Sequence, residues 1–258
     1  MIFHMPIWNM YDVHAWMVQW GLERDSLSTP SNLTIITCHN YSEKTYTEKH
    51  MDYVGIEYVT LQPDDLTAQW KNTNKISLPY EYIRDGRCST DYVIVIDASD
   101  VVFVNHPSTC VSVLGSYDCD MLFCGVNRKI GNYVLMPELK EEAELLQKTD
   151  FHINAGVWIA KTDSCLDILE DVNSFIDDSV YDGDWKTYSS LRNGKIDISF
   201  KDEWFPNYPY GIPSDQDLFR WVYPKYYPRM LIDVNLEFCR RNKKDIVNWI
   251  FDNKVTTN

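Results

Sequence analysis

The sequence is poor in basic residues and in histidine. It has 24 Lys and Arg against 38 Asp and Glu, for a formal net charge of -14, and it has 6 His. A protein that binds the nucleic-acid backbone needs a basic face, because its affinity comes from neutralising phosphates. We therefore expect no direct nucleic-acid binding, although a small local basic pocket is compatible with this charge.

Long apolar runs and paired cysteines are also missing. No run approaches the roughly 20 apolar residues that a membrane-spanning helix needs. Residues 1–6 lack the basic and apolar regions of a signal peptide. The 7 cysteines include no CxxC pair, and most of them stand in apolar runs. We therefore expect reduced, buried thiols in a cytoplasmic protein with no membrane span.

The length and the hydrophobic content indicate one large domain. The chain has 258 residues, of which 45% are hydrophobic, and this is enough for a full core. We predict a single domain over 1–258, with 1–30 as an N-terminal helical segment and 241–258 as a C-terminal helix or tail. Residues 177–213 are predicted to form an irregular loop, and so long a loop in a compact domain is usually functional or mobile.

Short apolar runs alternate with amphipathic segments along the chain. This β-α-β-α-β order predicts an α/β fold in which a mostly parallel sheet has helices on both faces. The predicted strands are 33–38, 56–61, 93–96, 121–124, a strand ending at 160, and 230–232. The predicted helices are 8–21, 43–51, 63–84 with an interruption at Pro79, 107–114, 138–148, 162–176 capped by Thr162, 214–222 and 243–251.

Two carboxylates follow the most apolar predicted strand. Residues 93–96 are all β-branched and predict a strand buried on both faces. Asp97 and Asp100 should stand where this strand leaves the sheet, at the edge where open α/β sheets bind ligands. Two carboxylates on a short turn repel each other unless a cation lies between them, and Mn²⁺ or Mg²⁺ suits such oxygen ligands. The alternative is a turn rich in Asp and Ser without a metal.

Two later segments add further candidates. Asn154-Ala155-Gly156 predicts a turn of small residues that introduces a strand and lets a ligand come close, with an ordinary turn as the alternative. Asp215 and Asp217 open a predicted helix after Ser214. The spacing of Ser214 and Asp217 is typical of a capping box, which would make Asp217 structural. Asp215 is the less constrained of the two.

These three segments, in this order, resemble the GT-A-type glycosyltransferases. The resemblance is closest to the glycosyltransferase domain of the procollagen lysyl hydroxylases and looser to the glycogenin-like retaining transferases. It covers roughly Leu33 to Arg240 and implies a GT-A-like (Rossmann-like) fold. It also implies transfer of a hexose, with retention, from a nucleoside diphosphate sugar such as a UDP-sugar to a hydroxyl of a protein, a glycan or a modified base. A metal held by Asp97 and Asp100 would neutralise the leaving diphosphate.

The resemblance also implies roles for individual residues. Asp215 and Asp217 would be the catalytic pair that contacts sugar hydroxyls. The donor-binding residues would be Thr37 and His39 at the base, Ser99 at the ribose, Lys75 at the diphosphate, and Asn154, Ala155 and Gly156 under the sugar. Lys75 has a plain alternative as a solvated helix lysine.

One part of the family pattern is missing, because no histidine follows His152. The family closes its metal site with a late histidine, so here the metal has fewer protein ligands, or Asp233 or Glu237 substitutes, or the site is weak. Two alternative functions therefore remain open. A sugar-1-phosphate nucleotidyltransferase would need a Gly-rich basic loop after the first strand, where residues 38–42 read CHNYS. A non-catalytic sugar- or nucleotide-binding module would have a degraded metal site.

Overall fold

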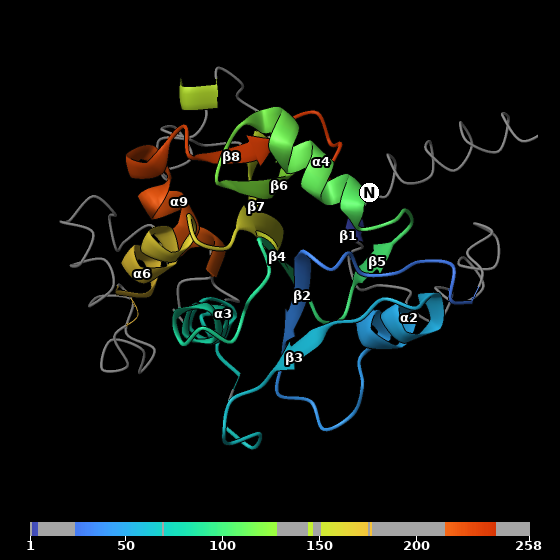
Figure 1. Ribbon diagram of the computed structural model, residues 1–258. Coiled ribbons are helices and arrows are strands. Elements are labelled where there is room, and N and C mark those ends of the chain that lie inside the picture. The colour runs from blue at the N-terminus through green and yellow to red at the C-terminus, as the bar shows by residue number, and fades with distance from the viewer. Residues whose placement is uncertain are drawn as a thin grey trace, which may run out of the picture.

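Two sheets organise the protein (Figure 1). The computed structural model describes residues 2–4, 24–68, 70–127, 144–146, 151–174, 176 and 215–240. The larger sheet has six strands in the order β3-β2-β4-β7-β6-β8, and the smaller has three in the order β5-β1-β9. The larger sheet contains β2 (Leu33–Cys38), β3 (Val59–Leu61), β4 (Tyr92–Asp97), β6 (Met121–Asn127), β7 (Phe151–Lys161) and β8 (Met230–Asp233). The smaller sheet contains β1 (Ile2–His4), β5 (Val101–Phe103) and β9 (Cys239–Arg240).

The larger sheet is mostly parallel. The pairs β2–β3, β2–β4 and β6–β8 are parallel, whereas β7 is antiparallel to both of its neighbours, β4 and β6. The helices are α2 (Tyr46–Val54), α3 (Asn74–Arg84), α4 (Ser108–Tyr117), α6 (Leu166–Ser174) and α9 (Asp215–Tyr226). The predicted α/β class with a mostly parallel sheet is confirmed.

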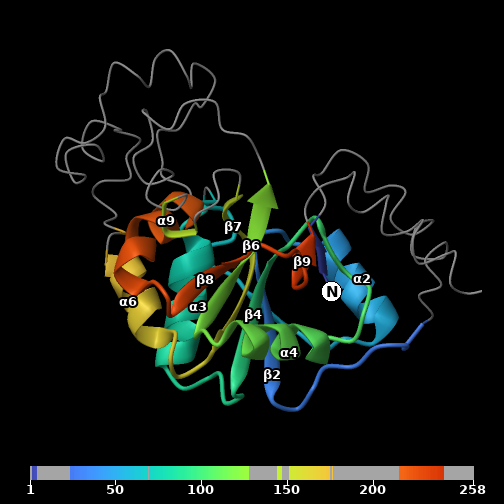
Figure 2. The ribbon, with the colours of Figure 1, turned by 90° about the horizontal axis from the view of Figure 1, so that it is seen from above.

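Helices cover both faces of the larger sheet, and β4 contributes to the core on each side. Val93 and Val95 pack in the core that also holds residues of α3, α6 and α9. Ile94 and Ile96 point the other way, into the core that holds residues of α2 and α4. Figures 1 and 2 show the same division into two helical layers. The uninterrupted apolar run of β4 follows from this arrangement, because a strand covered on both faces has no solvent side.

The smaller sheet anchors the turn that follows β4. Its strand β5 begins directly after Asp100 and pairs antiparallel with β1. From the other side, the Val101 amide donates to Thr47 Oγ1 at 3.0 Å and the Phe103 amide donates to His50 Nε2 at 2.9 Å. These contacts hold the Asp97–Asp100 turn between α2 and the smaller sheet.

Several element boundaries differ from the sequence predictions. Helix α3 begins at Asn74 rather than at 63, because Asp65 Oδ1 accepts the Thr67 amide at 2.8 Å in a local turn that competes with helix. The interruption predicted at Pro79 was wrong, since α3 runs through it and buries the ring. Thr162 does not cap α6, which begins at Leu166, and the buried Thr162 Oγ1 has no hydrogen-bond partner.

Other predictions fall largely outside the described residues. They are the helices at 8–21 and 243–251, the loop at 177–213, and the helix at 138–148 apart from 144–146, which are helical. Residues 24–30 form a turn and irregular backbone rather than helix. The single-domain boundaries stay a prediction.

All seven cysteines are free and buried, as the sequence predicted. Within the part of the chain that the structure describes, no helix has the length and apolar character needed to cross a membrane.

Candidate functional site

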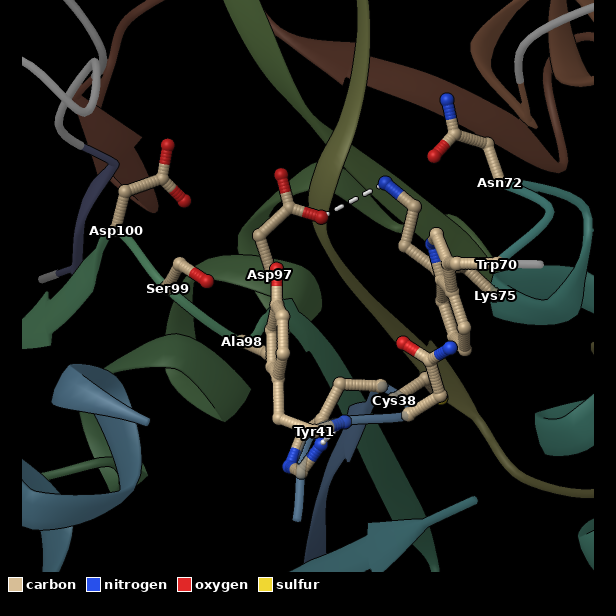
Figure 3. A pocket seen from close by; sticks show the side chains of 11 residues that line it. Cys38, Tyr41, Trp70, Asn72, Lys75, Asp97, Ala98, Ser99 and Asp100 are labelled. Atoms are coloured by element: carbon tan, nitrogen blue, oxygen red, sulfur yellow. Dashed lines mark hydrogen bonds and ion pairs between the residues drawn. The ribbon is translucent and has the colours of Figure 1, made fainter. Parts of the chain in front are cut away.

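A pocket of about 340 Å³ opens where β2 and β4 end (Figure 3). Cys38 and Asp97 are paired residues on the adjacent parallel strands β2 and β4, so the chain segments that follow them leave the sheet at the same edge. Parallel strands converge in this way at the ligand-binding edge of open α/β sheets. The lining residues are Cys38, His39, Asn40, Tyr41, Trp70, Asn72, Lys75, Asp97, Ala98, Ser99 and Asp100.

Lys75 joins two of the predicted carboxylates. Its Nζ lies 2.8 Å from Asp97 Oδ1 and 2.8 Å from Asp215 Oδ2. The lysine stands in the first turn of α3, where the helix dipole disfavours a cation, and its side chain is only 16% exposed. Lys75 is therefore not the solvated helix lysine that the sequence left open as an alternative.

The bridge shifts the proton affinity of both partners. Burial by itself lowers the pKa of Lys75, but the carboxylates of Asp215 and Asp97 outweigh it and raise that pKa above its ordinary value. Lys75 therefore stays charged. Burial raises the pKa of Asp215, and the nearby Lys75 opposes this rise. Asp215 also stands at the first residue of α9, where the helix dipole favours a carboxylate.

Acidic side chains gather around Lys75. Asp97 and Asp215 contact its ammonium group, and Asp100 lines the same pocket. Asp100 and Asp215 are both buried. Carboxylate oxygens are the ligands that a hard divalent cation prefers.

Asp97 and Asp100 fit such a cation as part of its shell. Figure 3 shows both carboxylates on the turn after β4, with Ser99 between them. Over the described ranges, no group of three or more His, Cys, Asp and Glu side chains could hold a metal by itself. Mg²⁺ keeps several waters and is bound through one or two carboxylates together with substrate phosphates. The donor set therefore fits a hard cation whose shell a phosphate completes.

His39 and Tyr41 form one wall of the pocket. The Tyr41 amide donates to His39 Nδ1 at 3.1 Å, so the proton of a neutral ring stands on Nε2, which faces Glu48 Oε2 at 3.2 Å. Burial raises the pKa of Glu48, but hydrogen bonds from Thr60, Thr45 and His39 outweigh it and lower that pKa. The Tyr41 ring stacks on His39 with centroids 5.4 Å apart and is 55% exposed. His39 therefore positions an aromatic ring that stays open to a ligand.

The Asn154-Ala155-Gly156 segment lies inside β7 rather than in a turn before it. The register between β6 and β7 shifts within this segment: Phe123 pairs with Trp158, whereas the next residue, Cys124, pairs with Asn154. The β7 residues between Asn154 and Trp158 therefore have no paired residue on β6. Gly55 and Gly86 are the glycines with positive φ in the described chain, so the backbone angle of Gly156 is not one that only glycine adopts readily. The amide groups of Asn154 and Gln216 are 3.1 Å apart.

The structure brings most of the predicted residues together. His39, Lys75, Asp97, Ser99 and Asp100 line the pocket, Asp215 joins them through Lys75, and Asn154 lies beside the next residue of α9. Ala155 is buried. The side chain of Asp217 lies outside the described residues.

Thr37 does not line the pocket, contrary to its predicted role at the base. Thr37 is fully buried. Its neighbour on β2, Cys38, lines the pocket instead. Neighbours on a strand point to opposite faces, so only one of this pair can reach the pocket.

No family model and no curated protein matches this chain. Several solved chains are similar to it, and one of them serves as an example. That protein is described as a glycosyltransferase involved in the glycosylation of the major capsid of PBCV-1. The two chains are 16% identical, the match covers 78% of this chain and 80% of the other, and the TM-score is 0.44.

Asp233 does not replace the missing histidine. Its Oδ1 accepts from Tyr117 Oη at 2.9 Å and from the Glu237 amide at 3.1 Å. Its Oδ2 accepts the Phe238 and Cys239 amides at 2.7 and 3.1 Å. The carboxylate is fully buried, so it ties the chain after β8 to α4 and has no position left for a metal.

Asp233→Ala is expected to lower the free energy of unfolding by about 3 kcal/mol, because it leaves several buried donors without an acceptor. Urea unfolding measures this change. The exposed neighbour Glu237 supplies the control, and Glu237→Ala should leave the unfolding midpoint unchanged. A stable Asp233→Ala protein that has lost its metal dependence would instead make Asp233 a ligand.

Several residues of the site had no role predicted from the sequence. Tyr41 could have been predicted, because an aromatic residue shortly after the first strand is expected at the ligand-binding edge of the sheet. Trp70 and Asn72 could not have been predicted, because their segment was expected to be part of a helix. Gln216 stands between the two candidate carboxylates Asp215 and Asp217 but had no predicted role.

Proposed function

We propose that this protein is a glycosyltransferase that moves a hexose from a nucleoside diphosphate sugar, a UDP-sugar, to a hydroxyl acceptor. One observation carries the proposal: Lys75 links Asp97, at the end of β4, with Asp215, at the start of α9, beside a pocket that also holds Asp100 and an open aromatic ring. The proposal is supported by the carboxylates, the buried acid and the aromatic ring that lie around or beside this one cavity.

The proposed binding mode runs along the pocket edge. The base stacks on Tyr41, the ribose lies near Ser99, and the diphosphate lies beside Asp97 and Asp100. The sugar then extends toward Asp215 and Asn154, where the buried carboxylate accepts hydrogen bonds from sugar hydroxyls. Lys75 keeps Asp215 ionised and in place for this contact.

Mn²⁺ or Mg²⁺, held by Asp97 and Asp100, would neutralise the charge that develops on the leaving diphosphate. The leaving diphosphate takes the proton of the acceptor hydroxyl. We also propose that the anomeric configuration is retained. The acceptor hydroxyl would belong to a protein, a glycan or a modified base. A cytoplasmic location, which the seven free thiols favour, belongs to the same proposal.

The two alternative functions differ from this proposal in ways that can be measured. A nucleotidyltransferase needs a glycine-rich basic loop to hold a triphosphate, whereas residues 38–42 contain no glycine. Among the described residues that line the pocket, Lys75 is the one Lys or Arg side chain. A non-catalytic module would bind a UDP-sugar and leave it intact.

The test is donor hydrolysis. The protein is incubated with UDP-glucose, UDP-galactose, UDP-xylose and UDP-N-acetylglucosamine in Mn²⁺, with and without chelator, and released UDP is measured. We expect metal-dependent release from at least one donor. Binding without release would support the non-catalytic module, and neither binding nor release with any donor would reject the proposal.

Tyr41→Ala is expected to weaken UDP binding by about 10-fold, since stacking of a base on an aromatic ring contributes roughly 1–3 kcal/mol. Tyr41→Phe should bind as the unchanged protein does. Calorimetric titration with UDP and Mn²⁺ measures the affinity. Tyr227, which is 40% exposed near the amino end of β8, provides the control, and an equal loss in Tyr227→Ala would show that the effect is not local.

A further inference from the structure

A buried glutamate lies behind the wall that His39 and Tyr41 form. Glu48 stands in the first turn of α2 and is 3% exposed. Its Oε2 accepts the Thr45 amide at 2.7 Å, and Thr45 Oγ1 accepts the Glu48 amide at 3.3 Å. This reciprocal pair is a capping box, which satisfies two backbone amides at the start of a helix.

The Glu48 carboxylate does more than cap the helix. Its Oε1 accepts from Thr60 Oγ1 of β3 at 2.5 Å, and its Oε2 lies 3.2 Å from His39 Nε2. Burying a carboxylate is unfavourable unless it is paired and hydrogen-bonded, and a capping box by itself does not require burial. Glu48 therefore joins α2, β3 and the segment after β2 at one buried point.

His39 passes the contact with Glu48 on to Tyr41. The Tyr41 amide donates to His39 Nδ1 at 3.1 Å, and Gln62 Nε2, which donates to the Tyr41 carbonyl at 2.9 Å, lies 3.4 Å from the same ring atom. Both neighbours of Nδ1 are donors, so the proton of the neutral ring is on Nε2. This buried Nε2 atom has no other hydrogen-bond partner among the described residues, so Glu48 is the group that fixes the ring.

We propose that Glu48 is a positioning residue that acts through His39 to hold Tyr41 in place for the nucleotide base. The Tyr41 ring also stacks on His39, with centroids 5.4 Å apart, so both the backbone and the ring of Tyr41 depend on where His39 lies. The use of this positioning in nucleotide binding rests on the proposed function, whereas the positioning itself does not.

A glutamate that only capped α2 would behave differently. Breaking the same capping box from its other side, by Thr45→Ala, would then have the same effects as Glu48→Ala. Thr45→Ala is the matched control, because it removes the cap and leaves the Glu48 carboxylate that faces Thr60 and His39. If Glu48→Ala does not fold, Glu48→Asp takes its place. Asp keeps the charge in the first turn of the helix but is one methylene too short to reach Thr45 and His39 together.

The first test needs no nucleotide. Hydrogen exchange of the Tyr41 amide is measured by NMR in the unchanged protein, Glu48→Ala and Thr45→Ala, relative to the Val95 amide in β4, which reports global unfolding. We expect the Tyr41 amide to exchange about 10-fold faster in Glu48→Ala, because its acceptor is no longer fixed, and less than about twofold faster in Thr45→Ala. Unchanged protection of Tyr41 in Glu48→Ala, or an equal loss in Thr45→Ala, would overturn the proposal.

The second test measures nucleotide binding. Glu48→Ala should weaken UDP binding in Mn²⁺ by about 5- to 10-fold, close to the loss expected for Tyr41→Ala, and should raise KM for a UDP-sugar more than it lowers kcat. In a Tyr41→Ala background, Glu48→Ala should weaken binding no further, because the two residues act as one unit. A full additional loss in that background, or an equal weakening in Thr45→Ala, would reject the positioning role. If the unchanged protein binds no UDP, the proposed function fails while hydrogen exchange still decides the positioning of Tyr41.

Discussion

Replacing Asp97 and Asp100 together by Asn is expected to lower metal-dependent UDP-sugar turnover by about 10³-fold, while the protein stays folded. Asn keeps the shape of each side chain but removes both charges that would hold the cation. Loss of the Lewis acid removes several kcal/mol of stabilisation from the transition state, and about 4 kcal/mol corresponds to 10³ in rate. Released UDP measures turnover, and the Tm with circular dichroism checks the fold.

The two single variants separate the roles of the carboxylates. Asp100→Asn leaves the Lys75 bridge intact, so we expect higher Mn²⁺ concentrations to restore part of its activity. Asp97→Asn also removes one partner of Lys75, so added Mn²⁺ should restore less. The control is Asp64→Asn with Asp163→Asn, which makes the same charge change at two exposed positions. Full activity in the Asp97→Asn, Asp100→Asn protein would show that the site lies elsewhere.

Lys75→Met is expected to lower the free energy of unfolding by about 3 kcal/mol at neutral pH, because it leaves two carboxylates without their counter-charge. Asp215 carries most of this penalty, being 6% exposed against 24% for Asp97. Adding Asp215→Asn should therefore recover much of the loss, since the second change removes the unpaired buried charge. Urea unfolding of the two single variants and the double variant measures this coupling.

The pH dependence of Lys75→Met follows from the buried carboxyl group. Burial already raises the pKa of Asp215, and without Lys75 the main opposing influence is gone, leaving the hydrogen bond from the Gln216 backbone amide. The folded state then takes up a proton that the unfolded state does not, so the variant should gain stability as the pH falls through the folded pKa of Asp215 toward its ordinary value of 3.8. The unchanged protein should show a smaller gain, because Lys75 holds the raised pKa of its Asp215 closer to the ordinary value.

A matched surface pair controls for the loss of a lysine. Lys225 Nζ lies 2.8 Å from Asp171 Oδ2, the same distance as in the Lys75 bridge, but its side chain is 62% exposed. Lys225→Met should leave stability unchanged, because water screens an exposed pair. If Lys75→Met also left the free energy of unfolding unchanged, the contacts of Lys75 with Asp97 and Asp215 would contribute no more than an exposed ion pair. The proposed role of Lys75 in holding Asp215 would then be rejected.

The central part of the fold could be predicted from local sequence patterns. The β-branched run at 93–96 predicted a strand buried on both faces, and β4 is that strand, with Asp97 as its last residue. The alternating order of strands and helices predicted the mostly parallel sheet. These features depend on local composition and periodicity, which a single sequence contains. The end of a buried strand is likewise readable, because a carboxylate cannot continue into an apolar core.

Which polar residues meet depends on tertiary packing, and local patterns do not predict it. Lys75 and Asp215 are 140 positions apart in the numbering, 215 minus 75, and no local pattern joins them. Their contact exists because α3 and α9 cover the same face of the sheet. Tertiary packing also put Cys38 rather than Thr37 at the pocket, brought Glu48 beside His39, and placed Asp233 among buried backbone donors. Burial and long-range pairing set these contacts, and neither is encoded in the spacing of neighbouring residues.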